Sequence, residues 1–142
     1  MKNQPKLQNE QELQQMYMQL QQIDTQISEI DKELRLIEQK RLEFLKLSED
    51  LGKVNDAKAN SNSFSNVGAG IFAETKLTNT KEFMINVGAN TYVKKSLKEV
   101  QALLNTQSAE LEKAEVQLQQ NMQMLNMQAQ IIQAEMQKSL GM

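Results

Sequence analysis

Apolar residues recur at alternating spacings of three and four along the first third of this 142-residue chain. The series consists of Leu13, Met16, Leu20, Ile23, Ile27, Ile30, Leu34 and Ile37, and Phe44 and Leu51 continue it. Such a repeat places a continuous apolar seam on one side of a helix, which is typical of a coiled coil. A second series repeats every seven residues towards the C-terminus, at Leu97, Leu104, Leu111, Leu118, Leu125 and Ile132. We expect the two helices to form an antiparallel hairpin with both chain termini at one tip.

The segment between the helices has the alternation of β-strands. Apolar and polar residues alternate along 71–77 and 83–87, as in half-buried strands. Val67-Gly68-Ala69-Gly70-Ile71-Phe72 is echoed twenty residues later by Val87-Gly88-Ala89-Asn90-Thr91-Tyr92. Both stretches predict a tight turn with positive φ at its centre. We therefore predict two β-hairpins, 63–67 with 71–77 and 83–87 with 91–94, with a turn at 78–81.

Local signals set the expected boundaries of a single domain covering residues 1–142. The first helix is predicted for 7–52 and ends at Gly52, because glycine suits the left-handed cap of a helix. A polar linker at 55–65 precedes the double hairpin of 63–94. Ser96 and Glu99 predict a capping box for a second helix at 96–139, with Gly141 as its stop. Helices of about 43 to 45 residues make arms about 65 Å long. Weaker residues beside the second leucine series predict looser packing in its distal third, with the apolar content moved to Met122, Ala129 and Met136.

Composition restricts the function classes. Only 4% of residues are aromatic and the mean hydropathy is −0.59, so we expect a thin core and association with other chains. The chain has no Cys and no His, which removes the usual nucleophiles, bases and soft metal ligands. We predict a non-enzyme with no catalytic residues, no bound metal and no cofactor. The pattern Gly68-x-Gly70-x-x-Ala73 resembles a dinucleotide fingerprint, but a strand follows it rather than a helix, so we interpret it as a turn.

Charge and hydropathy bear on partners and location. The net charge is −2 and no basic run is present, so we expect neither nucleic acid nor membrane as a partner. The N-terminal residues are polar, unlike a signal peptide, and no stretch approaches the about 20 apolar residues of a membrane span. These features, with the absence of Cys, predict a cytoplasmic protein.

The outer ends of both helices differ from an ordinary coiled coil. Within 7–22 and 116–142 the only charged residues are Glu10, Glu12, Glu135 and Lys138, and most of the methionines lie there. Neighbouring residues point in different directions around a helix, so one partner helix cannot cover all of them. Methionine suits surfaces that adapt to many partners. We therefore predict a client-binding surface for non-native chains at these tips, formed by Leu13, Met16, Tyr17, Met18, Leu20, Met122, Met124, Leu125, Met127, Ile131, Ile132 and Met136.

The double hairpin is predicted to be an assembly module. Two short hairpins are marginally stable alone, and their apolar faces and open edges invite pairing with other subunits. The residues expected to carry this assembly are Val67, Ile71, Phe72, Leu77, Phe83, Ile85 and Val87.

The order of helix, linker, double hairpin and helix resembles the α-class subunit of prefoldin, archaeal type. Besides the first glycine turn, the resemblance rests on Asn86-Val87-Gly88-Ala89-Asn90-Thr91-Tyr92-Val93-Lys94-Lys95. It implies a mainly α chain with a small β part, whose hairpins join an oligomeric β-barrel platform. It also implies a hexamer of two α and four β-class subunits, capture of unfolded proteins by the arm tips, and delivery to a group II chaperonin without nucleotide. Ser63-Phe64-Ser65-Asn66-Val67 is more polar than the family's usual first strand, which predicts a short strand there.

Two other functions fit parts of the pattern. A structural tether or scaffold without client binding would keep regular, charged heptads to its ends, which this chain does not. A nucleic-acid-binding arm would need a stripe of Lys and Arg, whereas the two tips together have one Lys.

Overall fold

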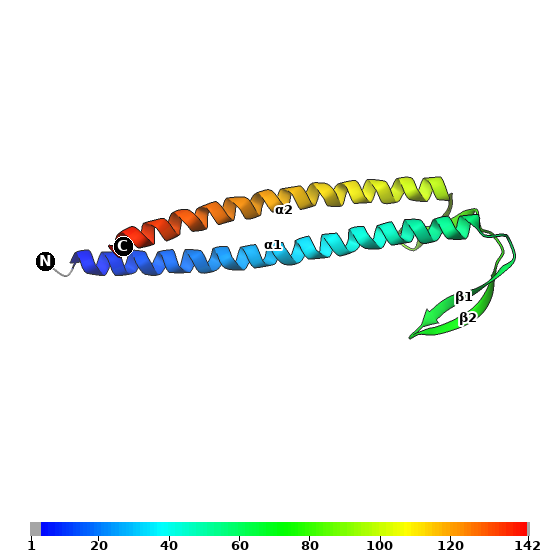
Figure 1. Cartoon of the computed structure of the whole chain (residues 1–142), viewed down its shortest axis with the longest axis horizontal. Helices are drawn as coiled ribbons and strands as arrows, with labels where there is room; N and C mark the ends of the chain where they lie inside the picture. Colours follow the sequence, from blue (N-terminus) through cyan, green and yellow to red (C-terminus); the bar gives the residue numbers. More distant parts are fainter. Residues whose placement is uncertain (1–3, 142) are drawn as a thin grey trace. The chain divides into compact units, whose positions relative to one another are not determined.

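A computed structural model describes residues 4–141, and its elements follow the expected order (Figure 1). They are α1 (Gln4–Asp56), β1 (Ser61–Gly68), β2 (Ile71–Leu77), β3 (Glu82–Gly88), β4 (Thr91–Ser96) and α2 (Leu97–Ser139). The described chain forms two compact units, one of residues 4–39 and 111–141 and the other of residues 40–110. Each helix contributes a segment to each unit. We call the first the tip unit and the second the hairpin unit.

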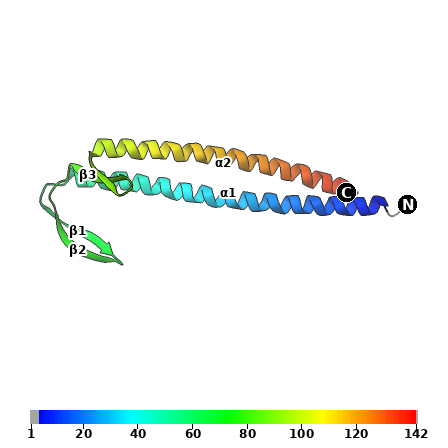
Figure 2. The same cartoon turned by 180° about the vertical axis from the view of Figure 1, so that it is seen from behind.

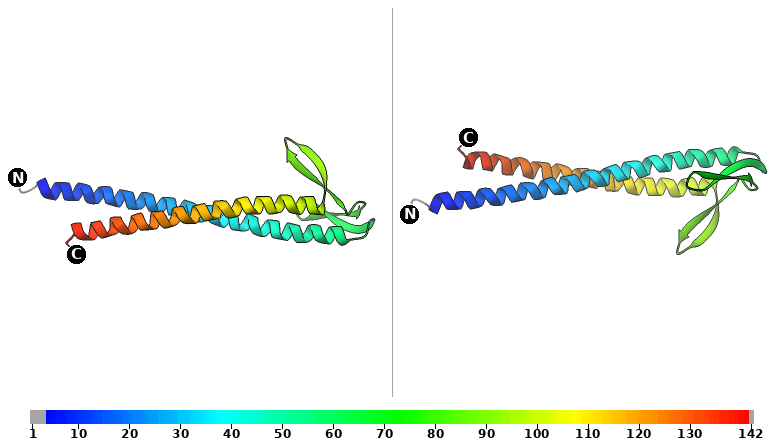
Figure 3. Two further views of the ribbon diagram at one scale, coloured as in Figure 1. Left: turned by 90° about the horizontal axis from the view of Figure 1, so that it is seen from above. Right: turned by 90° about the horizontal axis from the view of Figure 1, so that it is seen from below.

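In the tip unit, the N-terminal part of α1 and the C-terminal part of α2 lie side by side and run in opposite directions (Figures 1 and 2). The two ends of the described chain lie at the same end of this unit (Figure 3). This arrangement confirms the antiparallel pairing that the heptads predict. The seam residues of α1 are half-buried, apart from Ile23, which is fully buried: Leu13, Met16, Leu20, Ile23, Ile27, Ile30, Leu34 and Ile37.

The α2 side of the tip seam reaches Met136. Half-buried positions alternate along it at spacings of four and three: Leu111, Glu115, Leu118, Met122, Leu125, Ala129, Ile132 and Met136. The row of Met122, Ala129 and Met136, which holds the apolar content of the distal third, is thus half-buried. The looser packing of the distal third stays a prediction. The alternative row beside the leucines, which contains Asn121 and Gln128, is exposed. The half-buried row therefore continues the heptad pattern of α2.

The hairpin unit has its own small core. Val100 is the one buried hydrophobic residue that the structure describes in this unit, and half-buried residues surround it: Phe44 and Leu51 of α1, Phe83 and Ile85 of β3, and Leu104 of α2. Across residues 9–141, Ile23 and Val100 are the only buried hydrophobic side chains. A chain with so thin a core gains little stability from its own burial. This agrees with the expectation that it associates with other chains.

The end of α1 differs from the prediction. Gly52 lies inside the helix rather than beyond its end, and α1 continues to Asp56. A glycine in a helix costs about 0.5–1 kcal/mol relative to alanine. Leu51 and Val54 are half-buried on either side of it, so packing of the following turn outweighs this cost. The polar linker is correspondingly short, at 57–60, and Asn60 has the left-handed conformation there (φ 65°).

The strands form two separate antiparallel pairs, β1 with β2 and β3 with β4, which confirms the two predicted hairpins. The first strand is longer than expected, because β1 pairs with β2 from Ser61 through Gly68. Its polar residues do not shorten it, since backbone hydrogen bonds hold the pair and the Ser65 and Thr75 hydroxyl oxygens lie 3.1 Å apart across it.

The remaining local signals are confirmed. In the turn between the hairpins, the Asn79 Oδ1 atom accepts hydrogen bonds from the N–H groups of Lys81 (3.0 Å) and Glu82 (3.2 Å). At the start of α2, the Ser96 hydroxyl accepts the N–H of Glu99 at 3.3 Å and donates to its carboxylate at 3.2 Å. The bond from the Glu99 N–H satisfies one of the donors that the first turn of a helix leaves free.

Candidate functional site

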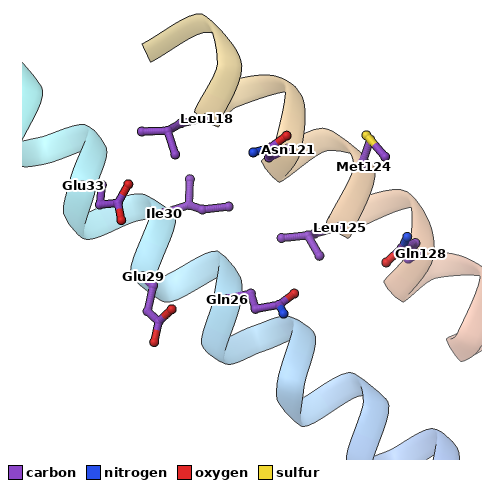
Figure 4. A pocket seen from close by; sticks show the side chains of 9 residues that line it. All are labelled: Gln26, Glu29, Ile30, Glu33, Leu118, Asn121, Met124, Leu125 and Gln128. Carbon is purple, nitrogen blue, oxygen red and sulfur yellow. The ribbon is translucent and has the colours of Figure 1, made fainter. Parts of the chain in front are cut away.

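The tip seam is a single layer of aliphatic side chains with polar flanks. Figure 4 shows Ile30 of α1 pointing towards Leu118 and Leu125 of α2. A cavity of about 370 Å³ lies here, and its remaining lining residues are Gln26, Glu29, Glu33, Asn121, Met124 and Gln128. The aliphatic layer holds the two helices together, while long polar side chains border it on both sides.

The predicted client-binding residues fall into two sets in the structure. The first set is half-buried in the seam: Leu13, Met16, Leu20, Met122, Leu125, Ile132 and Met136. The second set is exposed, with 58% to 62% of each residue accessible: Tyr17, Met18, Met124, Met127 and Ile131. We call this second set the outer tip residues. The structure thus brings all twelve predicted residues onto one unit but assigns only five of them to its open surface.

Two further hollows follow the same unit and mix apolar with amide side chains. One has a volume of about 530 Å³ and is lined by Tyr17, Leu20, Gln21, Asp24, Gln133, Met136, Gln137 and Leu140. The other measures about 450 Å³ and is lined by Gln19, Gln22, Ile23, Gln26, Gln128, Ile131, Ile132 and Glu135. Both present apolar groups beside amide groups, and each also has one carboxylate, Asp24 in the first hollow and Glu135 in the second. Apolar and amide groups together suit an extended chain with exposed backbone and apolar side chains.

Leu140 is a tip residue that the sequence interpretation missed. It lies just after the end of α2, is 55% exposed and lines the largest of these hollows together with Tyr17. The signal was available, because Leu140 is four residues beyond the seam residue Met136, but it falls where the helix was expected to have stopped.

The predicted assembly residues are also divided between open and covered positions. Val67, Ile71, Phe72 and Val87 are exposed on the hairpins, whereas Leu77, Phe83 and Ile85 are half-buried. Three exposed apolar residues of the hairpins were missed: Phe64, Met84 and Tyr92. The pairing register explains them, because Phe64 is opposite Glu74 and Phe72 is opposite Asn66, so both aromatic residues lie on one face of the first hairpin.

The two similar turn sequences, 67–72 and 87–92, also have the same backbone conformation. Asn66 and Asn86 each accept the N–H of the glycine two residues later, at 2.9 Å in both hairpins. Gly68 and Gly88 then take φ values of 123° and 124°, which favour glycine strongly. The next two residues of each turn also have positive φ, as a two-residue turn of type I′ requires. The interpretation of Gly68-x-Gly70 as a turn is therefore confirmed.

The faces of the two hairpins differ mainly in charge. In the second hairpin Met84 is opposite Lys94 and Asn86 is opposite Tyr92, whereas Phe64 is opposite Glu74 in the first. Equivalent positions of the two faces therefore have an acidic residue in one hairpin and a basic residue in the other. The same apolar pattern with opposite charge makes the two faces distinguishable to a partner.

An apolar groove of about 490 Å³ lies beside β3 in the hairpin unit. It is lined by Phe44, Leu47, Leu51, Phe83, Met84, Ile85, Asn86, Val100, Leu103, Leu104 and Gln107. Its apolar lining extends the apolar surface of the second hairpin onto both helices, which the sequence interpretation did not foresee.

Within residues 4–141, no group of three or more acidic, His or Cys side chains could hold a metal ion. Over the same part of the chain, none of the helices has the length and apolar character of a membrane-spanning segment.

Comparison with known proteins gives the class to which this architecture belongs. Residues 7–141 match the sequence model of the family described as prefoldin subunit, so the chain belongs to the prefoldin family. The cryo-electron microscopy structure of a filamentous prefoldin from Methanocaldococcus jannaschii superimposes with a TM-score of 0.77, at 15% sequence identity, covering 83% of this chain and 98% of that one. Two long helices joined by two antiparallel hairpins are thus the prefoldin fold. Prefoldins are a class of chaperone rather than of enzyme, and the chain has the role of a chaperone subunit.

A relative indicates the class of subunit. The prefoldin subunit alpha of Methanocorpusculum labreanum is 27% identical over 105 residues, which are 74% of this chain and 71% of that protein. This agrees with the α-class resemblance of the sequence.

Proposed function

We propose that this subunit captures non-native proteins with its outer tip residues and passes them to a group II chaperonin without nucleotide. The single observation that supports capture most directly is the exposure of Tyr17, Met18, Met124, Met127 and Ile131 beside a seam that is already filled. Water contact at these side chains is unfavourable, and burying them against a client contributes about 25 cal/mol for each Å² of apolar surface covered.

The chemistry of the tip suits a client without a fixed shape. Methionine side chains are flexible and polarizable, so they adapt to different apolar groups. The surrounding glutamines offer donors and acceptors to a client backbone without imposing a charge pattern. A clamp of this kind holds many sequences weakly and gains strength when several arms act on one client.

The proposal includes an assembly with other subunits through the double hairpin. The exposed apolar residues of both hairpins support this, since isolated hairpins of this size are marginally stable. We propose a hexamer of two α and four β-class subunits in the cytoplasm, in which the hairpins form a β-barrel platform. A chain without Cys suits the reducing conditions of that compartment.

The test compares two sets of three matched substitutions in the assembled protein. The tip set is Met18, Met124 and Met127, each changed to Ser. The control set is Leu36, Leu42 and Leu45, also changed to Ser, which are equally exposed at 60% to 64% but do not belong to the predicted tip surface. The measurement is suppression of aggregation of a chemically unfolded model protein at matched oligomer concentration.

We expect the tip set to reduce suppression strongly and the control set to leave it nearly unchanged. Equal effects of the two sets would show that exposed apolar surface anywhere on the helices serves for capture. No effect of the tip set would favour the alternative function, a structural tether without client binding.

A further inference from the structure

We propose that Met18, Met124 and Met127 form an oxidation site at which a hydroperoxide reversibly switches off client capture while the helix pair stays folded. The inference rests on the proposed function, since it assigns a regulation to the same tip surface. It starts from the different environments of the tip methionines. Met18, Met124 and Met127 are 60% to 62% exposed, whereas Met16, Met122 and Met136 are half-buried in the seam.

The chain lacks the side chains that would compete with methionine for an oxidant. The chain has no Cys, which would otherwise react first as a thiolate, and no Trp or His. The thioether of methionine is then the group most readily oxidised by two electrons. Accessibility decides which thioethers react, so the three exposed methionines of the tip precede the three of the seam.

The reaction is balanced with one equivalent of hydroperoxide. The methionine sulfur attacks the distal oxygen of the peroxide, the O–O bond breaks and an S–O bond forms. The sulfur loses two electrons and becomes a sulfoxide, and the peroxide is reduced to water or to an alcohol. The product is polar and chiral, so the side chain no longer offers an apolar surface.

The geometry separates the effect on capture from the effect on folding. The exposed methionines lie outside the seam, which is filled by residues such as Ile23, Ile30 and Leu125, so their sulfoxides remain in water without disturbing the helix pair. Oxidation of the seam methionines would instead place a polar group between the helices, at a cost in stability. Peroxide therefore acts first on the surface that binds clients and only later on the fold.

The experiment treats the full-length protein, in its purified oligomeric form, with a series of hydrogen peroxide doses and then removes the peroxide with catalase. Peptide mass spectrometry gives the sulfoxide content of each methionine, and circular dichroism gives the helix content and the melting temperature. Capture is measured with reduced, guanidinium-unfolded lysozyme as the client probe. Capture by the untreated protein tests the proposed function separately, and its absence there would overturn that proposal rather than the order of oxidation.

We expect sulfoxide at Met18, Met124 and Met127 at doses that leave Met16, Met122 and Met136 mostly reduced. At those doses capture should fall by about tenfold, because both copies of this subunit in the proposed hexamer lose apolar surface together, while helix content and melting temperature stay unchanged. Methionine sulfoxide reductases supplied with a dithiol should restore capture, because the dithiol provides the two electrons that return the sulfoxide to the thioether and the oxygen leaves as water. Equal oxidation of seam and exposed methionines, loss of helix content together with capture, or failure of the reductases to restore it would overturn the proposal.

Two variants isolate the responsible side chains, each compared with itself before and after peroxide. A variant with Leu at Met18, Met124 and Met127 should keep the same capture after peroxide as before it. A matched variant with Leu at Met16, Met122 and Met136 should still lose about tenfold, since its exposed methionines remain. In both variants Met84 is also changed to Leu, because it is 65% exposed on β3 and its oxidation would act on the hairpin instead. A loss of capture in the first variant equal to that in the second would assign the effect to other residues.

Discussion

Two glycines of the hairpin unit should respond with opposite sign to the same added methyl group. Gly52 lies inside α1 and Gly88 lies in the turn of the second hairpin with a φ of 124°. A Cβ atom built on either glycine meets no other atom within 4 Å, so the effect of alanine comes from the backbone alone. Gly52→Ala should stabilise the protein by about 0.5–1 kcal/mol, because alanine loses less conformational freedom in a helix.

Gly88→Ala should destabilise it by about 1–3 kcal/mol, since a side chain at this φ is strained even in open space. The assay is thermal unfolding followed by circular dichroism, at one protein concentration because an oligomer's melting temperature depends on it. With about 2–4 °C for each kcal/mol in a chain of this size, Gly52→Ala should raise the melting temperature slightly and Gly88→Ala should lower it by several degrees. A lower melting temperature for Gly52→Ala would refute the reasoning, since it would mean that Gly52 has the left-handed cap conformation predicted from the sequence.

Three further predictions concern assembly and capture. Ile85→Asp should dissociate the oligomer in sedimentation, because it adds a charge to a half-buried strand residue; Asn86→Asp should not, since residue 86 is exposed and a carboxylate still accepts the N–H of Gly88. A chain shortened to residues 20–118 should keep the oligomer but lose most suppression of aggregation, and full protection by it would place the client site outside the tips. Capture should also persist at high salt, because few charges lie at the tips to be screened; a steep decrease with salt would indicate electrostatic binding.

The sequence predicted the parts of the fold that depend on periodicity and on turn chemistry. The two heptad series, the paired hairpins and the cap at Ser96 all appear as expected. The errors lie where packing competes with local preference. Gly52 suggested a helix end, but the half-buried Val54 continues the helix, and the polar residues of β1 hid a strand that backbone pairing alone sustains.

The sequence predicted which residues gather at the candidate site, but not which of them are exposed and which are half-buried. A heptad pattern shows which residues form a seam, but the sequence could not tell which methionines remain exposed. That depends on whether the row of Asn121 and Gln128 or the row of Met122, Ala129 and Met136 faces α1. The structure selects the row of Met122, Ala129 and Met136, and this choice leaves Met124 and Met127 outside. The missed hairpin residues Phe64 and Tyr92 likewise required the strand register, which fixes the face of every side chain.

In the tip unit, half-buried seam residues have exposed apolar neighbours in the sequence. Helix packing explains why the seam residues are apolar, but not why their neighbours are. Ile132 is half-buried in the seam, whereas Ile131 beside it is 58% exposed; Met16 is half-buried, whereas Tyr17 and Met18 are open to water. A two-helix coiled coil needs apolar residues on its seam and is more soluble with polar ones elsewhere. The seam continues without interruption to Met136, so the outer tip residues add nothing to it. We propose that a partner covers these residues for part of the time, and a non-native chain is the partner that an adaptable surface with few charges accepts most readily.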